Sequence, residues 1–185
     1  SQIRRGVPAD VVILAREGLD ELIVEGRMVV GTDVDLASSG IGVVVRAGAP
    51  KPDISTVEAL RQTLLRAPSV SVSTSTSGRY LTEELFPRLG IAEEMAAKTQ
   101  TAGAAAVGSG DAELGLQQVS EVRFIPGTDF VGAIPEEVQY VTTYSAAIVG
   151  TSTQADAARR LIAFLSSEAA SRVILSKGME PAQRR

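Results

Sequence analysis

The stretch from Val70 to Tyr80 carries side chains suited to binding a small negatively charged molecule. Five consecutive residues, Ser73, Thr74, Ser75, Thr76 and Ser77, carry hydroxyl groups, and Arg79 adds a full positive charge. Apolar residues from Tyr80 to Leu89 recur at helical spacing, so the stretch predicts a strand, a polar loop and a helix start. Because the first helical turn leaves backbone N–H groups unpaired, such a loop can hold an anion. The alternative is that Ser77 caps the helix and the other hydroxyls are solvated.

Other side chains could complete a ligand site. Arg16 and Arg79 could each form a bidentate bond with a carboxylate, which fits an organic acid better than a tetrahedral oxyanion, or each could be a solvated surface arginine. Tyr144 lies within an apolar run and could donate to a ligand or to a backbone group in the core. A polar segment also follows a predicted strand: Gln117, Gln118 and Val119, with Ser120 and Glu121 either capping a helix or contacting a ligand.

Composition excludes several classes of function. The chain has no histidine and no cysteine, which removes the imidazole base, the thiolate nucleophile and the usual zinc ligands, so we assign no catalytic residue, metal site or cofactor. The net charge is −4 and no basic block is present, which argues against nucleic acid as a partner. No apolar run approaches the roughly 20 residues that span a bilayer, so we expect no membrane insertion.

The hydrophobic pattern indicates an α/β architecture with largely parallel sheets. Short apolar runs predict strands at 11–14, 40–45, 70–73, 112–117, 130–134 and 138–149. Helices are predicted between them, at 19–25, 56–66, 77–89, 93–98, 102–110, 153–165 and 168–177. Because ligands bind outside the carboxyl ends of parallel strands, the polar residues that follow the strands are expected to converge on one site.

Three local features are more specific. The continuous apolar run at 11–14 predicts a strand that is buried on both faces. Ser55 and Glu58 match a capping box that opens the helix at 56–66. In the helix at 153–165, the residues expected to face the core are Ala157, Leu161 and either Phe164 or Leu165.

Four motifs resemble, in the same order, the molybdate-binding branch of the type II periplasmic solute-binding proteins of ABC transporters. They are Pro8-Ala-Asp-Val-Val-Ile13, Ser77-Gly-Arg-Tyr80, Gly108-Ser-Gly-Asp-Ala-Glu-Leu-Gly115 and Tyr144-Ser-Ala-Ala147. The resemblance covers nearly the whole chain. It implies a two-lobe fold with two crossing strands, near 41–45 and 139–148. Lobe I would hold residues 1–44 and 141–185, and lobe II would hold residues 45–140.

The resemblance also implies the site and the partners. The ligand would lie in the interlobe cleft of a monomeric periplasmic protein and would be passed to a membrane permease. Thr74, Ser75 and Thr76 would hold an oxyanion, the segment from Gln117 to Val119 would supply a backbone N–H, and the hydroxyl of Tyr144 would donate to the ligand.

The sequence departs from this family in two places. Relatives begin with a strand and helix that this chain does not show, so lobe I is expected to lack that unit. Molybdate binders carry Asp-Pro-Ala where Thr74-Ser-Thr-Ser77 stands here, so the ligand can be a molybdate-like oxyanion or a short carboxylate.

Three functions therefore stay open. The first is capture of a small anion for transport. The second is isomerisation or tautomerisation of a small unsaturated organic acid on the same scaffold, as in aconitate isomerase, with Glu, Asp, Lys or Tyr as the base. The third is a ligand-sensing domain of a transcription regulator, which would need a DNA-binding segment that this sequence lacks.

Overall fold

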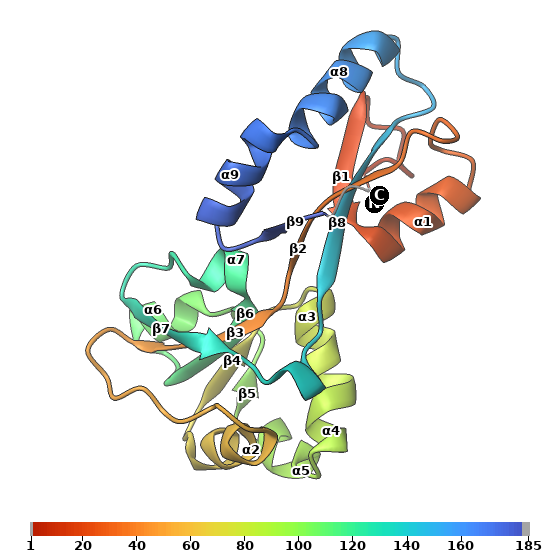
Figure 1. Cartoon of the computed structure of the whole chain (residues 1–185). Helices are drawn as coiled ribbons and strands as arrows, with labels where there is room; N and C mark the ends of the chain where they lie inside the picture. The colour runs from red at the N-terminus through yellow and green to blue at the C-terminus, as the bar shows by residue number, and fades with distance from the viewer. Residues whose placement is uncertain (1, 183–185) are drawn as a thin grey trace. The chain divides into compact units, whose positions relative to one another are not determined.

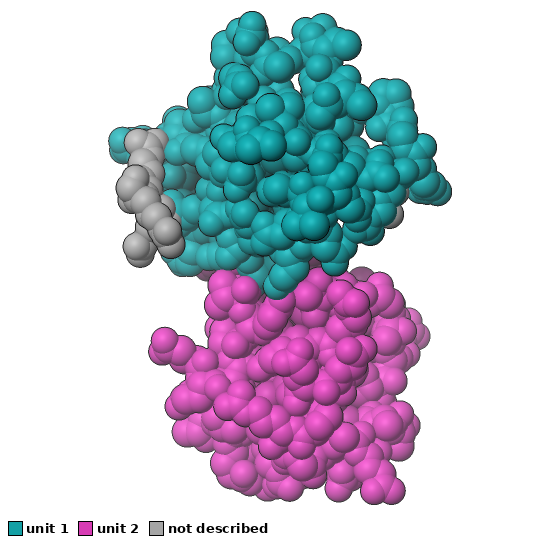
Figure 2. Space-filling view, turned by 90° about the vertical axis from the view of Figure 1, so that its right-hand side faces the viewer, with its two compact units in different colours: residues 1–38, 142–185 teal, residues 39–141 magenta. Residues whose placement is uncertain are grey.

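The computed structural model describes residues 2–182, which fall into two units according to their contacts. Unit 1 comprises residues 1–38 and 142–185, and unit 2 comprises residues 39–141, as coloured in Figure 2. Each unit is built around its own sheet. The chain enters unit 2 at Ser39, where β2 (Val34–Ser39) ends and before β3 (Ile41–Arg46) begins, and it returns to unit 1 at the start of β8 (Thr142–Ile148), as Figure 1 shows.

Unit 1 contains a four-stranded sheet in the order β1-β8-β2-β9. Its strands are β1 (Val11–Ala15), β2 (Val34–Ser39), β8 (Thr142–Ile148) and β9 (Glu180–Pro181). β1 pairs antiparallel with β8. The prediction that the first strand is buried on both faces is wrong, because Val12 is buried whereas the next residue, Ile13, is 51% exposed.

Helices cover both faces of this sheet. They are α1 (Arg16–Val24), α8 (Ala155–Leu165) and α9 (Glu168–Ser176). Successive residues of β8 point to opposite faces, so Ala147 packs with Leu19 of α1, whereas Ala146 packs with Ile162 of α8.

The face of α8 that packs on the sheet differs from the predicted one. Its buried residues are Ala158 and Ile162, whereas Leu161 is 46% exposed and Phe164 is 59% exposed. Adjacent helical residues lie about 100° apart around the axis. The prediction of Leu161 in place of Ile162 as a core residue therefore rotates the predicted face away from the core. Leu165 is partly buried against the core, as predicted.

Unit 2 contains a five-stranded sheet in the order β5-β4-β6-β3-β7. Its strands are β3 (Ile41–Arg46), β4 (Val70–Val72), β5 (Thr99–Gln100), β6 (Leu114–Gln118) and β7 (Thr128–Ala133). β4 is parallel to β5 and β6, whereas β3 is antiparallel to β6 and β7. The α/β class is therefore confirmed, but the sheets are mixed rather than largely parallel. An apolar run indicates burial on both faces, which antiparallel strands between helix layers also have.

Two helix layers enclose the sheet of unit 2. One layer contains α2 (Val57–Arg66), α3 (Thr76–Arg79), the π-helical segment η1 (Tyr80–Leu85), α4 (Phe86–Arg88) and α5 (Ala92–Ala96). The other contains α6 (Ala105–Ser109) and α7 (Val119–Val122), and a 3-10 turn, η2 (Glu136–Val138), precedes β8. Val43 and Val45 of β3 pack in the hydrophobic cluster between the sheet and the layer of α2, and Val44 packs in the cluster on the side of α6 and α7.

Helix α2 begins one residue later than its predicted capping box. The Thr56 hydroxyl accepts a hydrogen bond from the backbone N–H of Ala59 at 3.1 Å. Glu58 instead accepts from Gln62 within the helix. Ser55 donates its backbone N–H to Asp53, and hydrogen bonds from Ser55 lower the pKa of the Asp53 carboxyl. The prediction of a Ser55 cap is therefore wrong by one position.

The division between the units falls after residues 38 and 141, whereas from the sequence we placed the lobe boundaries after residues 44 and 140. The first difference arises because β3 pairs with β6 and β7 along its length and so belongs to unit 2.

Candidate functional site

The carboxyl ends of β4 and β6 lie side by side in unit 2. The two strands are parallel, and Val72 at the end of β4 lies opposite Leu116, two residues before β6 ends at Gln118. The structure therefore brings the hydroxyl loop, defined as residues 73–77, next to the polar segment at 117–119.

Hydrogen bonds between side chains order the hydroxyl loop. The hydroxyl oxygens of Ser73 and Ser75 lie 2.6 Å apart, and those of Ser75 and Ser77 lie 3.0 Å apart. Ser77 is fully buried, whereas Thr74 and Ser75 are exposed and Thr76 is half-buried. Helix α3 has Ser75 at its N-cap position. The alternative in which Ser77 is the cap is therefore wrong, and Ser77 lies inside the first turn.

The helix that follows the loop is continuous through α3, η1 and α4, from Thr76 to Arg88. Its first-turn N–H groups and its dipole make the loop attractive to an anion. Gly78 allows the helix to approach the strand end, because a Cβ at this position would overlap the carbonyl oxygen of Ser73. The π segment ends at Leu85, two residues before Pro87, which lacks the N–H that a regular helix would donate to the Glu83 carbonyl.

Hydrogen bonds to other residues of unit 2 hold the polar segment at 117–119 in place. The side chain of Gln117 accepts from the backbone N–H of Ala104 at 2.9 Å and donates to Glu121. The backbone N–H of Val119 donates to the carbonyl of Gly40 at 2.8 Å, so an anion would have to replace that bond. Gln118 is buried. A ligand contact by these three residues stays a prediction.

Arg79 borders a small hollow beside the hydroxyl loop. The hollow has a volume of about 130 Å³ and is lined by Thr76, Arg79, Tyr80, Glu83, Glu84 and Tyr140. Tyr80 and Tyr140 stack with ring centroids 4.9 Å apart, and the Tyr80 hydroxyl donates to the carbonyl of Val138 at 2.9 Å. Burial raises the pKa of Tyr80 above its ordinary value. Arg79 is exposed, and its guanidinium forms no ion pair with residues 2–182.

Arg16 and Tyr144 are neighbours in unit 1. Ala15, at the end of β1, pairs with Tyr144 of β8, and Arg16 follows as the first residue of α1. The Arg16 guanidinium contacts three carboxylates: Asp20 at 2.7 Å, Asp33 at 3.0 Å and Asp35 at 3.4 Å. The hydrogen bond to Asp20 is the main reason that the pKa of Arg16 is raised. Arg16 is therefore ion-paired with carboxylates of unit 1.

The structure thus assembles two groups of predicted site residues. The group in unit 2 contains Thr74, Ser75, Thr76, Ser77, Arg79, Gln117, Gln118 and Val119. The group in unit 1 contains Arg16 and Tyr144. The carboxylates around Arg16 are not among the site residues predicted from the sequence, although the alternation Asp33-Val34-Asp35 places both acids on one side of an extended segment. Among residues 2–182, no group of three acidic side chains is arranged to hold a metal ion.

A match to a family model along nearly the whole chain shows which protein family this chain belongs to. The family model for bacterial extracellular solute-binding proteins matches residues 1–180. The chain belongs to this family. Within the described range 2–182, no helix of this solute-binding protein combines the length and apolar composition needed to cross a membrane.

This solute-binding protein is also similar in sequence to an isomerase. It is 43% identical, over 185 residues, to an aconitate isomerase from a Pseudomonas species. The match covers 98% of this chain and 71% of the relative.

Solved structures of molybdate-binding proteins share the fold. The periplasmic molybdate-binding protein of Azotobacter vinelandii matches with a TM-score of 0.77 and 20% identity, over 98% of this chain and 82% of that one. The substrate-binding domain of a putative molybdenum ABC transporter from Clostridium difficile matches with a TM-score of 0.73 and 23% identity, over 98% of this chain and 81% of that one. The periplasmic-binding-protein-like fold expected from the sequence is therefore confirmed.

Proposed function

We propose that this solute-binding protein captures a short carboxylic acid in the periplasm and delivers it to the membrane permease of an ABC transporter. The observation that carries the proposal is the hydroxyl loop at the start of the helix from Thr76 to Arg88, with Arg79 one turn into that helix. Exposed hydroxyls, first-turn N–H groups and a guanidinium together favour a small anion.

The two arginines differ in a way that favours a carboxylate at the hydroxyl loop. Arg16 is already paired with Asp20, Asp33 and Asp35, so a ligand there would have to displace a carboxylate of the protein. Arg79 has no such partner in residues 2–182, and its planar guanidinium matches the geometry of a carboxylate. We therefore assign the charged contact to Arg79 rather than to Arg16.

The remaining contacts follow from the loop and from the family resemblance. Thr74, Ser75 and Thr76 supply hydroxyls and N–H groups to the anion, and Ser77 holds the loop in shape from its buried position. The segment from Gln117 to Val119 lies beside the loop and supplies a further donor when the Val119 N–H exchanges its bond to the Gly40 carbonyl for one to the anion. The resemblance to molybdate binders supports a contribution from the Tyr144 hydroxyl.

Calorimetric titration tests this proposal. The ligands are short di- and tricarboxylates, molybdate, tungstate and sulfate, each added to the wild-type chain. We expect saturable binding of a carboxylate, and Arg79→Gln should weaken it about tenfold because a charge-assisted hydrogen bond is lost. The matched control is Arg123→Gln, an exposed arginine elsewhere in unit 2. Binding of molybdate in preference to every carboxylate, with no effect of Arg79→Gln, would contradict the carboxylate assignment.

A second candidate function is isomerisation of a small unsaturated tricarboxylic acid. The observation that favours it is the 43% identity to the Pseudomonas aconitate isomerase. An allylic shift needs a base that removes a proton from the saturated carbon, after which the double bond moves and a proton returns to its other end. Histidine is absent, so we propose Glu121, which accepts a hydrogen bond from Gln117 at the edge of the hydroxyl loop.

Deuterium exchange separates the two functions. Aconitate is incubated with the protein in heavy water, and its proton spectrum is followed by NMR. Incorporation of deuterium supports the isomerase, and Glu121→Gln should abolish it while calorimetric binding persists. Glu94→Gln, on the exposed surface of α5, is the control. Binding of aconitate without any exchange would contradict the isomerase and leave the carrier.

A further inference from the structure

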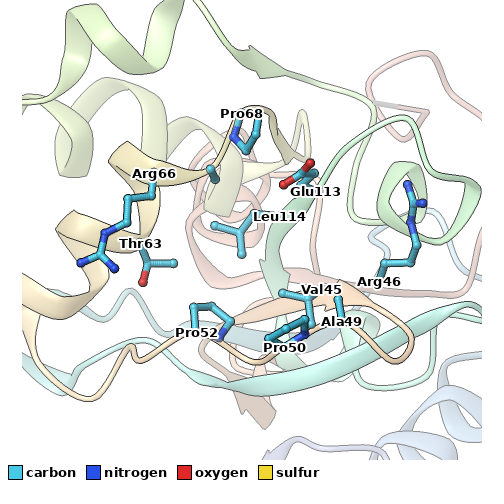
Figure 3. A pocket seen from close by; sticks show the side chains of 11 residues that line it. Val45, Arg46, Ala49, Pro50, Pro52, Thr63, Arg66, Pro68, Glu113 and Leu114 are labelled. Carbon is cyan, nitrogen blue, oxygen red and sulfur yellow. The ribbon is translucent and has the colours of Figure 1, made fainter.

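A larger cavity of unit 2 opens at the opposite edge of its sheet from the hydroxyl loop. It has a volume of about 510 Å³. Ala67 and Pro68, which precede β4, line it together with Leu114 at the start of β6. The other lining residues are Val45, Arg46, Ala49, Pro50, Pro52, Thr63, Arg66 and Glu113 (Figure 3). We call this space the proline cavity. It shares no residue with the proposed ligand site.

The floor and walls of the proline cavity are apolar and fixed in shape. Val45 and Leu114 are buried, and Figure 3 shows Leu114 between the prolines of the loop below it and Pro68 above it. Each proline ring fixes one backbone dihedral, so the walls have little freedom to collapse. A cavity of this size and composition lies within the range of small-molecule sites, roughly 300–1,000 Å³.

Hydrogen bonds to neighbouring segments fix the positions of the cavity walls. The Thr63 hydroxyl donates to the carbonyl of Asp53 at 2.8 Å, which ties α2 to the segment that follows Pro52. Lys98 donates to the carbonyls of Leu64, Leu65 and Ala67 at 2.7–2.8 Å, which fixes the end of α2. The cavity is therefore formed before any ligand arrives.

The charges at the rim favour an anion. Two arginines, Arg46 and Arg66, line the cavity together with one carboxylate, Glu113. Arg46 donates to the carbonyl of Gly110 at 3.1 Å. Arg66 is exposed in the last turn of α2 and forms no ion pair with residues 2–182. Its guanidinium is therefore available to a ligand.

We propose that the proline cavity is a second binding site, for a small amphiphilic anion that consists of a flat apolar body and one carboxylate. The body packs on Leu114 and the prolines, and the carboxylate pairs with Arg66. Such a molecule differs from the short polar acids proposed for the hydroxyl loop, which have no apolar body to bury.

The probe is 2-naphthoate, added to the isotopically labelled full chain and followed by protein NMR. We expect saturable shifts of the backbone amides of 45–49, 66–67, 69–70 and 113–114, with those of 73–79 and 117–119 unchanged. The neutral analogue 2-naphthalenemethanol should shift the same amides and bind about three- to fivefold more weakly, because it lacks the partner for Arg66.

Two variants and one control make the assignment specific. Arg66→Gln should reduce the affinity for naphthoate to that of the alcohol, and Ala49→Trp should fill the cavity and abolish binding of both. Arg123→Gln should change neither affinity. Because Arg66 is exposed, its variant keeps the test decisive even if Ala49→Trp does not fold.

Either of two results would overturn the proposal. One is the absence of saturable shifts with naphthoate at about 5 mM, a concentration above the largest dissociation constant expected of a specific site. The other is a set of shifts confined to the hydroxyl loop, or a response that Arg66→Gln leaves unchanged.

Discussion

Gly78 lies directly against the carbonyl oxygen of Ser73, so closely that a Cβ on residue 78 would overlap that oxygen. Gly78→Ala should therefore force the start of α3 away from the end of β4. We expect a loss of about 2–3 kcal/mol in the free energy of unfolding, the cost of overpacking a rigid backbone contact. Urea unfolding followed by circular dichroism measures it.

Gly132→Ala is the matched control, because a Cβ at residue 132 would meet Ile54 Cδ1 at an ordinary 3.7 Å. The control should be neutral or slightly stabilising. If the two variants were equally stable, the close approach of helix and strand would not exist in solution.

Arg16 neutralises three carboxylates, so its replacement should act on stability rather than on ligand affinity. Arg16→Gln leaves Asp20, Asp33 and Asp35 facing one another, and we expect a loss of about 1 kcal/mol in the free energy of unfolding. Added salt should reduce the loss, because the repulsion is screened. Arg159→Gln, an exposed arginine of α8, is the comparison. A large loss of carboxylate affinity with unchanged stability would show that Arg16 binds the ligand.

Tyr80 should make stability fall at high pH. Burial raises the pKa of its hydroxyl in the folded chain, whereas in the unfolded chain the phenol ionises near pH 10. Below pH 10 both states are protonated and the full stability is present. Above pH 10 the unfolded state loses its proton first, so the free energy of unfolding falls as pH rises.

Tyr80→Phe removes this part of the pH dependence. The variant also loses the hydrogen bond to Val138, so its free energy of unfolding at pH 8 should be lower by about 1 kcal/mol. Urea unfolding at a series of pH values compares the two slopes. A slope above pH 10 that is identical in both proteins would contradict the assignment.

The start of α2 can be tested by two neighbouring hydroxyl variants. Thr56→Ala removes the acceptor of the Ala59 N–H and should cost about 1 kcal/mol, the usual value of an N-cap side chain. Ser55→Ala leaves that cap in place, so we expect a smaller loss. Thermal unfolding of the pair decides the point, and the reverse order would restore the capping box predicted from the sequence.

Several features of the fold and site could be predicted because they depend on local sequence. The strand at 70–72 and the helix after it follow from a short apolar run and a change to helical spacing. The hydroxyl loop is adjacent to both in the chain, so its position at the start of a helix follows directly. Gln117 meets this loop because β4 and β6 run parallel, which the alternation of strands and helices indicated.

Other features depend on residues far apart in the sequence and could not be predicted. Asp33 and Asp35 reach Arg16 only after the chain has folded back, so the sequence alone leaves Arg16 as either a ligand contact or a solvated surface residue. The buried face of α8 depends on how that helix rotates on the sheet, which the spacing of its apolar residues does not fix. Strand direction in the mixed sheets is likewise a property of the topology.

The pairing of β1 with β8 has a consequence for the order of events during synthesis. Val11 finds its partner only at Ile148, whereas every strand of unit 2 is translated between these two positions. On a ribosome, unit 2 can therefore finish folding before β8, the pairing partner of β1, has been synthesised. In that interval the early segment offers unsatisfied strand edges to chaperones and proteases, and mutations that delay unit 2 will prolong its exposure.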